Sequence, residues 1–197
     1  MDSFLNIAKD IWQWVDYIHI REKKLTLEQQ MYWAQSLKTQ GVASNRIIMN
    51  GSDQLDQHAS IGGVHWGQAV IRSYDKDELR RVDRLRVGVS VHSLEEAKFA
   101  EERGADYLFY GHVYASKSKP NCEPRGLRAL AEVCAKVSIP VIAIGGIETE
   151  NIAAIRTAGA SGAAVISTIW TTDKPELAAA ALRQAITDSE KYAELRR

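Results

Sequence analysis

The sequence predicts one α/β domain built as a TIM-type (β/α)8 barrel, and three observations support this prediction. Seven short β-type runs alternate with segments of helical spacing, which is typical of parallel strands joined by crossover helices. Two of these runs place polar side chains on a single face, as strands that line a barrel can do. The length of 197 residues suits one domain and is short for two.

The elements are expected in a regular order along the chain. A helix over Ser3–Trp14 comes first, and an amphipathic helix from Pro175 to Arg197 comes last. The expected strands are Val15–Ile20, Arg46–Asn50, Gly63–Trp66, Arg86–Val91, Asp106–Gly111, Val141–Ile144 and Gly162–Ile166. The helices between them include Thr26–Gln40, Leu94–Arg103, Leu127–Lys136 and Asn151–Ala158, whose apolar residues recur three and four positions apart.

Polar residues on one strand face favour a barrel over an open, doubly wound sheet. In YIHIR, Tyr17, His19 and Arg21 alternate with two isoleucines, and in VGVSVH the same alternation groups Ser90 with His92. Strands of an open sheet that is covered by helices on both sides are apolar on both faces. The alternation therefore predicts a barrel with polar side chains pointing inward.

One strand is missing from the count of a full eight-stranded barrel. Either the first strand lies unrecognised within the opening residues, or the chain begins downstream of it. A barrel without that strand has two unpaired sheet edges, which a homodimer or a displaced segment would have to cover.

The composition excludes several classes of partner. Lys plus Arg and Asp plus Glu both number 25, so a net charge of zero gives no general attraction to nucleic acid or to anionic lipid. The N-terminal segment has charges among its apolar residues, unlike a signal peptide or a membrane span. Cys122 and Cys134 are expected to be free thiols, which fits a cytoplasmic protein.

The strongest signal for an anion site is IPVIAIGGIETEN at 139–151. A buried strand leads into Gly145–Gly146 and then into a helix, expected to be capped near Thr149 or Glu150, and glycines let backbone amides approach a phosphate. The next strand adds amides at Ile166 and Ser167, where barrels of this class often bind phosphate. The alternative is that the two glycines simply make a tight turn.

The loop GHVYASKSKP at 111–120 carries the candidate for proton transfer. His112 is the only side chain in it with an ordinary pKa near neutrality, so it suits general acid–base catalysis. Lys117 and Lys119 can bind an anionic substrate. The alternatives are a structural or exposed histidine and solvated lysines.

Arg21, at the end of the first strand, can bind a carboxylate or a phosphate with two hydrogen bonds. Its alternative role is an ordinary ion pair with Glu22 or Asp16. No zinc site is expected, because metal-ligand spacing is absent from the histidines on or beside strands, His19, His65 and His92.

With these motifs in place, the chain resembles the thiamine phosphate synthase and thiazole tautomerase superfamily from Tyr17 to Trp170. The matching segments are YIHIREK, IMNG, GVHWGQ, GVSVHSLEEA, GADYLFYGHVYASKSK, IPVIAIGGI and GAAVISTI. The resemblance implies a (β/α)8 barrel that binds a thiazole phosphate at its C-terminal mouth. The residues that match the phosphate site are Ser116, Lys117, Ser118, Gly146, Ile166 and Ser167.

The departures from the synthase pattern suggest a different reaction. Synthases hold Mg²⁺ with two aspartates, whereas this chain has Gly51 after Asn50 and Val70 after GVHWGQA, and neither supplies a side-chain oxygen. His19 replaces the glutamine of the synthase QxRxK motif. His112 stands where synthases have the proline of Gly-Pro-Val, so the chain looks closest to the tautomerase (TenI-type) subgroup.

The resemblance therefore implies a thiazole tautomerase that aromatises a carboxythiazole phosphate without a metal or a cofactor. His112 would shuttle the proton, while Arg21 and Lys119 hold the substrate carboxylate and Gly145, Gly146, Ile166 and Ser167 hold the phosphate. His19, Asn50 and Ser90 complete the expected substrate-binding set. Two alternatives remain: a thiamine phosphate synthase with relocated Mg²⁺ ligands, and a non-catalytic protein that binds thiazole phosphate.

Overall fold

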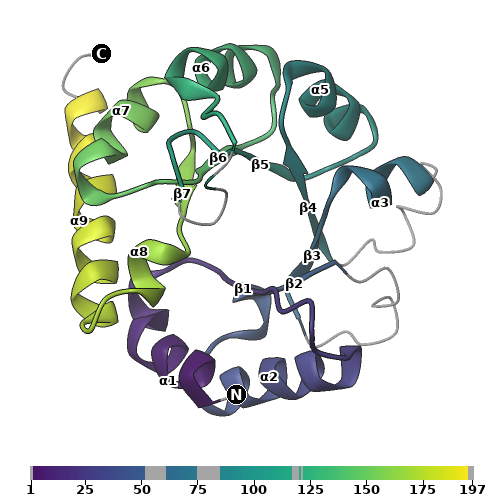
Figure 1. The fold of residues 1–197 in the computed structure, drawn as a ribbon, viewed down its shortest axis with the longest axis vertical. Coiled ribbons are helices and arrows are strands. Elements are labelled where there is room, and N and C mark those ends of the chain that lie inside the picture. The colour runs from purple at the N-terminus through teal and green to yellow at the C-terminus, as the bar shows by residue number, and fades with distance from the viewer. Residues whose placement is uncertain (1, 52–60, 75–84, 117–119, 121, 195–197) are drawn as a thin grey trace.

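A computed structural model describes residues 2–51, 61–74, 85–116, 120 and 122–194. Its seven strands are all parallel, pair in the order β1 to β7 and curl into a half-barrel with the helices outside (Figure 1). The strands are β1 (Ile18–Ile20), β2 (Ile47–Asn50), β3 (Gly63–Trp66), β4 (Arg86–Val91), β5 (Tyr107–Gly111), β6 (Val141–Ile144) and β7 (Gly162–Ala164).

The seven strands confirm the order and the type of the strands expected from the sequence. Three of them, β3, β4 and β6, have the expected bounds. β7 is shorter than expected because Val165 leads into a helical turn instead of continuing the strand. A run of apolar residues does not by itself show where hydrogen bonding to the next strand stops.

Within the described ranges, the helices also follow the expected order, with some short additions. They are α1 (Asp2–Ile11), η1 (Trp12–Trp14), α2 (Leu27–Thr39), η2 (Ser44–Arg46), α3 (Gln68–Ser73), α5 (Leu94–Glu102), α6 (Gly126–Lys136), η5 (Thr149–Asn151), α7 (Ile152–Thr157), α8 (Ser167–Trp170) and α9 (Pro175–Glu194). The sequence did not predict α3 and α8, because six and four residues are too few to show a helical period.

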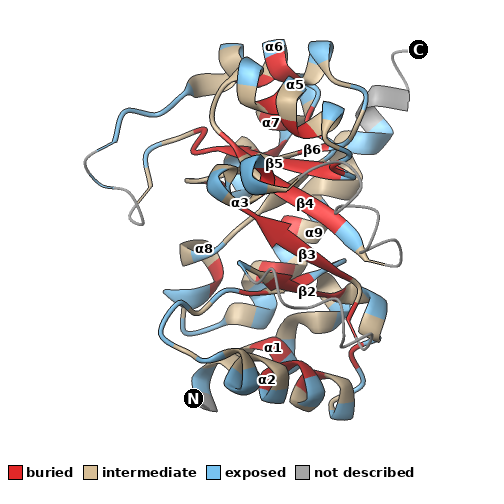
Figure 2. Ribbon diagram, turned by 90° about the vertical axis from the view of Figure 1, so that its right-hand side faces the viewer, coloured by how far each residue is buried: buried red, intermediate tan, exposed pale blue. Residues whose placement is uncertain are grey.

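The hydrophobic core lies between the strands and the surrounding helices (Figure 2). In β4 the side chains of Val87, Val89 and Val91 point outward into this core and are buried. Burial of one such side chain stabilises the fold by about 1.5–3 kcal/mol. The alternate residues, among them Gly88 and Ser90, point into the barrel, so the predicted alternation of faces is confirmed.

Among the described residues, β1 and β7 each have one unpaired edge. The layer of helices continues across this opening, since α9 packs on α7 and on α1. Arg183 attaches α9 to the segment before β1, because it donates to the Trp14 carbonyl at 3.0 Å and to the Asp16 carboxylate at 2.6 Å. The predicted barrel is thus present as a curled seven-stranded sheet. None of the helices in the described ranges is long and apolar enough to span a membrane.

Candidate active site at the barrel mouth

The candidate residues gather where the parallel strands end, because all carboxyl ends point to the same side of the sheet. In chain order they are Arg21 after β1, Asn50 in β2, Ser90 in β4, His112 after β5, Gly145 and Gly146 after β6, and Ile166 and Ser167 after β7. Lys117, Ser118 and Lys119 lie outside the described residues, and Ser116 before them is half-buried.

The double-glycine turn packs directly on the loop that follows β5. Gly145 and Gly146 have φ angles of 96° and 65°, which favour glycine. A Cβ on Gly145 would lie 2.2 Å from His112 Cβ, and a Cβ on Gly146 would lie 2.4 Å from the Ala115 carbonyl oxygen. The turn is therefore required both by conformation and by close packing, which is compatible with backbone amides that face a ligand.

His112 lies beneath this turn and is buried. Its Nε2 donates to the Cys122 carbonyl at 3.1 Å, because a carbonyl oxygen can only accept. Nδ1 is buried and has no hydrogen-bond partner among the described residues. The ring is thus near the double-glycine turn and away from bulk water.

One hydrogen bond holds the loop after β6 together, and a second connects it to the helix after β7. Asn151 donates to the Gly146 carbonyl at 2.9 Å, and Thr168 in α8 donates to the Ile147 carbonyl at 2.7 Å. The amides at the start of α8, including Ser167, have no acceptor within that helix. The cap expected near Thr149 or Glu150 is at the adjacent Glu148, with Asn151 as its reciprocal partner.

A buried polar network occupies the barrel interior. His65 contacts the Tyr107 hydroxyl through Nδ1 at 3.2 Å and the Ser90 hydroxyl through Nε2 at 2.8 Å. Gly88 makes room for it, because a Cβ there would lie 2.0 Å from the Tyr107 ring. The sequence pattern gave His65 no role beyond that of a possible metal ligand and gave Tyr107 none, although alternation along β3 and β5 points both inward.

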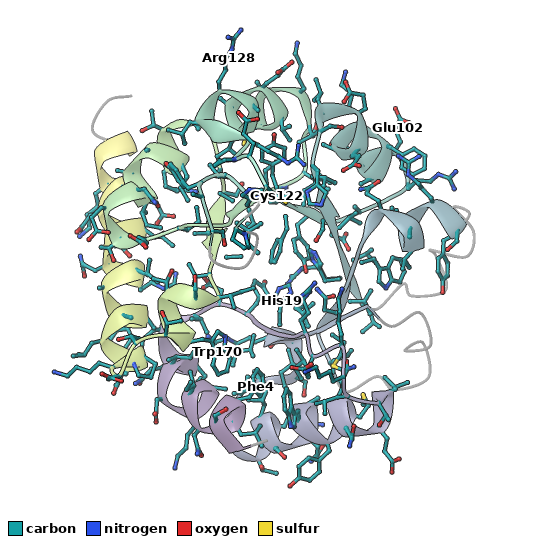
Figure 3. All side chains as sticks on the ribbon, in the orientation of Figure 1. Phe4, His19, Glu102, Cys122, Arg128 and Trp170 are labelled. Carbon is teal, nitrogen blue, oxygen red and sulfur yellow. The ribbon has the colours of Figure 1, made fainter. Side chains whose placement is uncertain are left out.

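His19 lies in the barrel interior beside this network, as Figure 3 shows. Its ring centroid is 5.4 Å from that of His65 and 4.8 Å from that of Phe109. Burial lowers the pKa of His19 to about 4. Burial also lowers the pKa of His65 well below 6.5, and the charges of His19 and Arg21 add to that effect. Both imidazoles are neutral at pH 7.

Arg21 is exposed, and its charge reaches the interior, as its effect on His65 indicates. The alternative of an ordinary ion pair is wrong for both acids that were considered. Asp16 pairs with Arg183 at 2.6 Å, and the Glu22 carboxylate accepts from the Lys24 amide. No other carboxylate in the described part of the chain pairs with Arg21. As far as the described residues show, the guanidinium is therefore available to an anionic ligand.

The grouping of His92 with Ser90 is also wrong. β4 ends at Val91, and the His92 ring instead bonds to the Gly111 carbonyl. The His92 side chain does not follow the alternation of β4, because the chain leaves the strand there and begins the cap of α5 at Ser93.

The two positions that carry aspartate in the synthase pattern offer no oxygen here. Gly51 has no side chain, and its Cβ direction is empty to 4 Å; Val70 is half-buried and apolar. Among the described residues, no group of three or more His, Cys, Asp or Glu side chains could hold a metal ion. The described residues therefore do not fit the two-aspartate Mg²⁺ site.

A family model described as thiamine monophosphate synthase matches residues 2–169. The chain belongs to this family. Among curated relatives, the thiamine-phosphate synthase of Chlorobium phaeovibrioides is 36% identical over 176 residues, which cover 87% of this chain and 83% of that protein. The Geobacillus thermodenitrificans synthase is 37% identical, with coverage of 85% and 74%. For a Synechococcus synthase, 35% identical, the chain spans about half of the relative's length, 49%.

Solved structures agree with the family and the fold. The thiamine phosphate pyrophosphorylase of Pyrococcus furiosus superposes with a TM-score of 0.81 at 25% identity and covers 94% of this chain and 90% of that one. A 3-hexulose-6-phosphate synthase, with a TM-score of 0.69 and 19% identity over 92% of both chains, shares the fold. The expected superfamily and barrel fold are confirmed.

The expectation of a thiazole tautomerase is wrong by this comparison. The curated relatives are 34–41% identical and are named thiamine-phosphate synthases. The family is enzymatic, but its named activity is that of a synthase, which is a transferase, and not of an isomerase. The histidine at position 112 suggested a tautomerase, but a difference at one position is weaker evidence of activity than similarity over the whole chain.

Proposed function

We propose that this protein is a thiamine-phosphate synthase, which couples a pyrimidine diphosphate to a thiazole phosphate and releases diphosphate. The observation that carries the proposal is the match of 2–169 to the family, with curated synthases 34–41% identical. The arrangement of the mouth supports it, because loops after β5, β6 and β7 lie in contact and can enclose a phosphate. The work of such a site is mostly positioning of two anionic substrates.

The thiazole phosphate is proposed to bind at the loops after β6 and β7. The amides of Gly146, Ile166 and Ser167 would donate to phosphate oxygens, and the Ser167 hydroxyl adds a further donor. Glycine at 145 and 146 brings the backbone close to the ligand. Ser116, at the start of the loop that holds Lys117, Ser118 and Lys119, is proposed to close this site.

The pyrimidine diphosphate is proposed to lie on the side of β1 and β2. Arg21 has no carboxylate partner within the described ranges and can neutralise the departing diphosphate. His19 is neutral and offers one donor and one acceptor, so it can replace the glutamine of the synthase pattern. Asn50 in β2 and Ser90 in β4 add further polar side chains to the proposed lining. Synthases use Mg²⁺, but Gly51 and Val70 do not fit the known ligand set, and we assign no residue to it.

The test is an assay of the purified protein with both substrates and Mg²⁺, in which thiamine phosphate is measured directly. We expect product with wild type and with His112→Pro, because synthases have proline at that position. Arg21→Met should lower turnover by about 100-fold, a typical cost of losing one group that stabilises developing charge. No product from wild-type protein at any Mg²⁺ concentration would contradict the proposal.

A second candidate is a protein that binds thiazole phosphate without catalysis, and the loss of side-chain oxygens at 51 and 70 is the observation that favours it. Calorimetry with the thiazole phosphate, combined with the assay for thiamine phosphate, separates the two candidates. Binding with no thiamine phosphate formed would support this second candidate. For either function we propose a cytoplasmic location, since Cys122 and Cys134 are free.

A further inference from the structure

We propose that His92 and Arg125 are positioning residues that hold the mouth loop from outside the barrel. They would fix the backbone of 111–114 and, through it, the double-glycine turn. The effect on turnover rests on the proposed synthase function, whereas the effect on the backbone does not.

Both side chains bond to one carbonyl oxygen at the end of β5. His92 Nδ1 donates to the Gly111 oxygen at 2.7 Å, and Arg125 Nε donates to the same oxygen at 3.0 Å. A carbonyl oxygen has two lone pairs, so this acceptor is fully used. The peptide that links Gly111 to His112 is therefore held from α6 and from the end of β4 together.

The start of α6 adds two backbone hydrogen bonds to the same segment. The Arg125 amide donates to the His112 carbonyl at 3.0 Å, and the Gly126 amide donates to the Val113 carbonyl at 3.0 Å. Arg125 thus contacts the segment through its side chain and its main chain. This double attachment sets both the position and the register of the loop relative to α6.

The segment 111–114 is also hydrogen-bonded to the turn after β6. The Val113 amide donates to the Ile144 carbonyl at 2.9 Å, and the Tyr114 amide donates to the Gly145 carbonyl at 3.1 Å. A Cβ on Gly146 would lie 2.8 Å from the Cβ of Tyr114, so there is no space for a side chain at position 146. A shift of the segment would therefore move Gly145 and Gly146, because packing this close transmits displacement.

His92 and Arg125 lie outside the barrel interior. They line a pocket of about 320 Å³ between α5 and α6, together with Glu95, Glu132 and the buried Tyr110. Tyr110 points outward from β5, on the opposite face to Phe109. The pair consequently acts on a ligand at the mouth only through the backbone of 111–114.

The test combines hydrogen exchange with kinetics in Arg125→Met, His92→Leu and the double variant. We expect the Val113 and Tyr114 amides to exchange about tenfold faster in each single variant, since their opening is opposed by these bonds. The KM for thiazole phosphate should rise about fivefold with kcat less affected, because ground-state binding depends on the turn. The double variant should show less than the summed effect, because both donors share one acceptor.

Conservative variants and one matched control separate positioning from general destabilisation. Arg125→Lys and His92→Asn keep a donor and should restore much of the protection. Arg128→Met on the same helix removes an exposed cation that points away from the barrel (Figure 3) and should change neither readout. Wild-type exchange rates at Val113 and Tyr114 in the double variant would overturn the proposal. Absence of turnover in wild type would refute the synthase and leave the exchange test valid.

Discussion

Lowering the pH from 7 to 5 should destabilise the fold, because two imidazoles inside the barrel must stay neutral. In the unfolded chain both histidines bind a proton near their ordinary pKa of 6.5. In the folded protein the pKa of His19 is about 4 and that of His65 is also lowered. The unfolded state therefore binds more protons below pH 6.5, and stability falls with pH.

The size of the effect depends on how far the pH lies below the ordinary pKa of 6.5. Each pH unit below 6.5 costs about 1.4 kcal/mol for each histidine that stays neutral. At pH 5, His19 should have lost about 2 kcal/mol, and His65 should add a loss of the same sign. The loss from His19 should continue to about pH 4 and then level off. A loss of this size is a sizeable part of the usual stability of about 5–15 kcal/mol.

Urea unfolding at pH 7, 6 and 5 measures this loss directly. The wild-type free energy of unfolding should fall by more than about 2 kcal/mol, and His19→Gln should lose about 2 kcal/mol less than wild type over the same range. Equal stability of the wild-type protein at pH 7 and pH 5 would refute the reasoning. It would mean that both imidazoles accept a proton in the folded state.

Three substitutions test other parts of the structure by thermal or urea unfolding. Gly145→Ala should cost about 1–3 kcal/mol more than Gly104→Ala, since both have φ near 95° but only Gly145 has close contacts; equal losses would contradict the packing argument. Gly88→Ala should lower the stability, because its Cβ would collide with the Tyr107 ring, and an unchanged free energy of unfolding would count against the network. Thr26→Ala should cost about 1 kcal/mol, because Thr26 forms a capping box with Gln29 at the start of α2, and a loss below the error of the method would show the box to be dispensable.

The alternation of residues was sufficient to predict most of the fold. The pattern in β4, with valines on one face and Gly88 and Ser90 on the other, indicated a strand that lines a barrel, and the structure confirms it. Glycines at 145 and 146 indicated a turn after β6, and the structure has one there. Such features are visible in sequence because strand and turn geometry depend on residues that are neighbours in the chain.

The subgroup could not be predicted in this way. The substitution of His112 for proline suggested a tautomerase, but the relatives of the whole chain are synthases. One side chain shows which chemistry is available, while the activity depends on all groups that surround the ligand.

From the sequence alone came the strand order, the inward-facing polar residues and the family. Only the tertiary structure placed His65 between Tyr107 and Ser90, kept two histidines neutral, and brought His92 and Arg125 onto the Gly111 carbonyl. These contacts join residues 14 to 42 positions apart. Their partners are chosen by the curvature of the sheet and by burial, which no local pattern records.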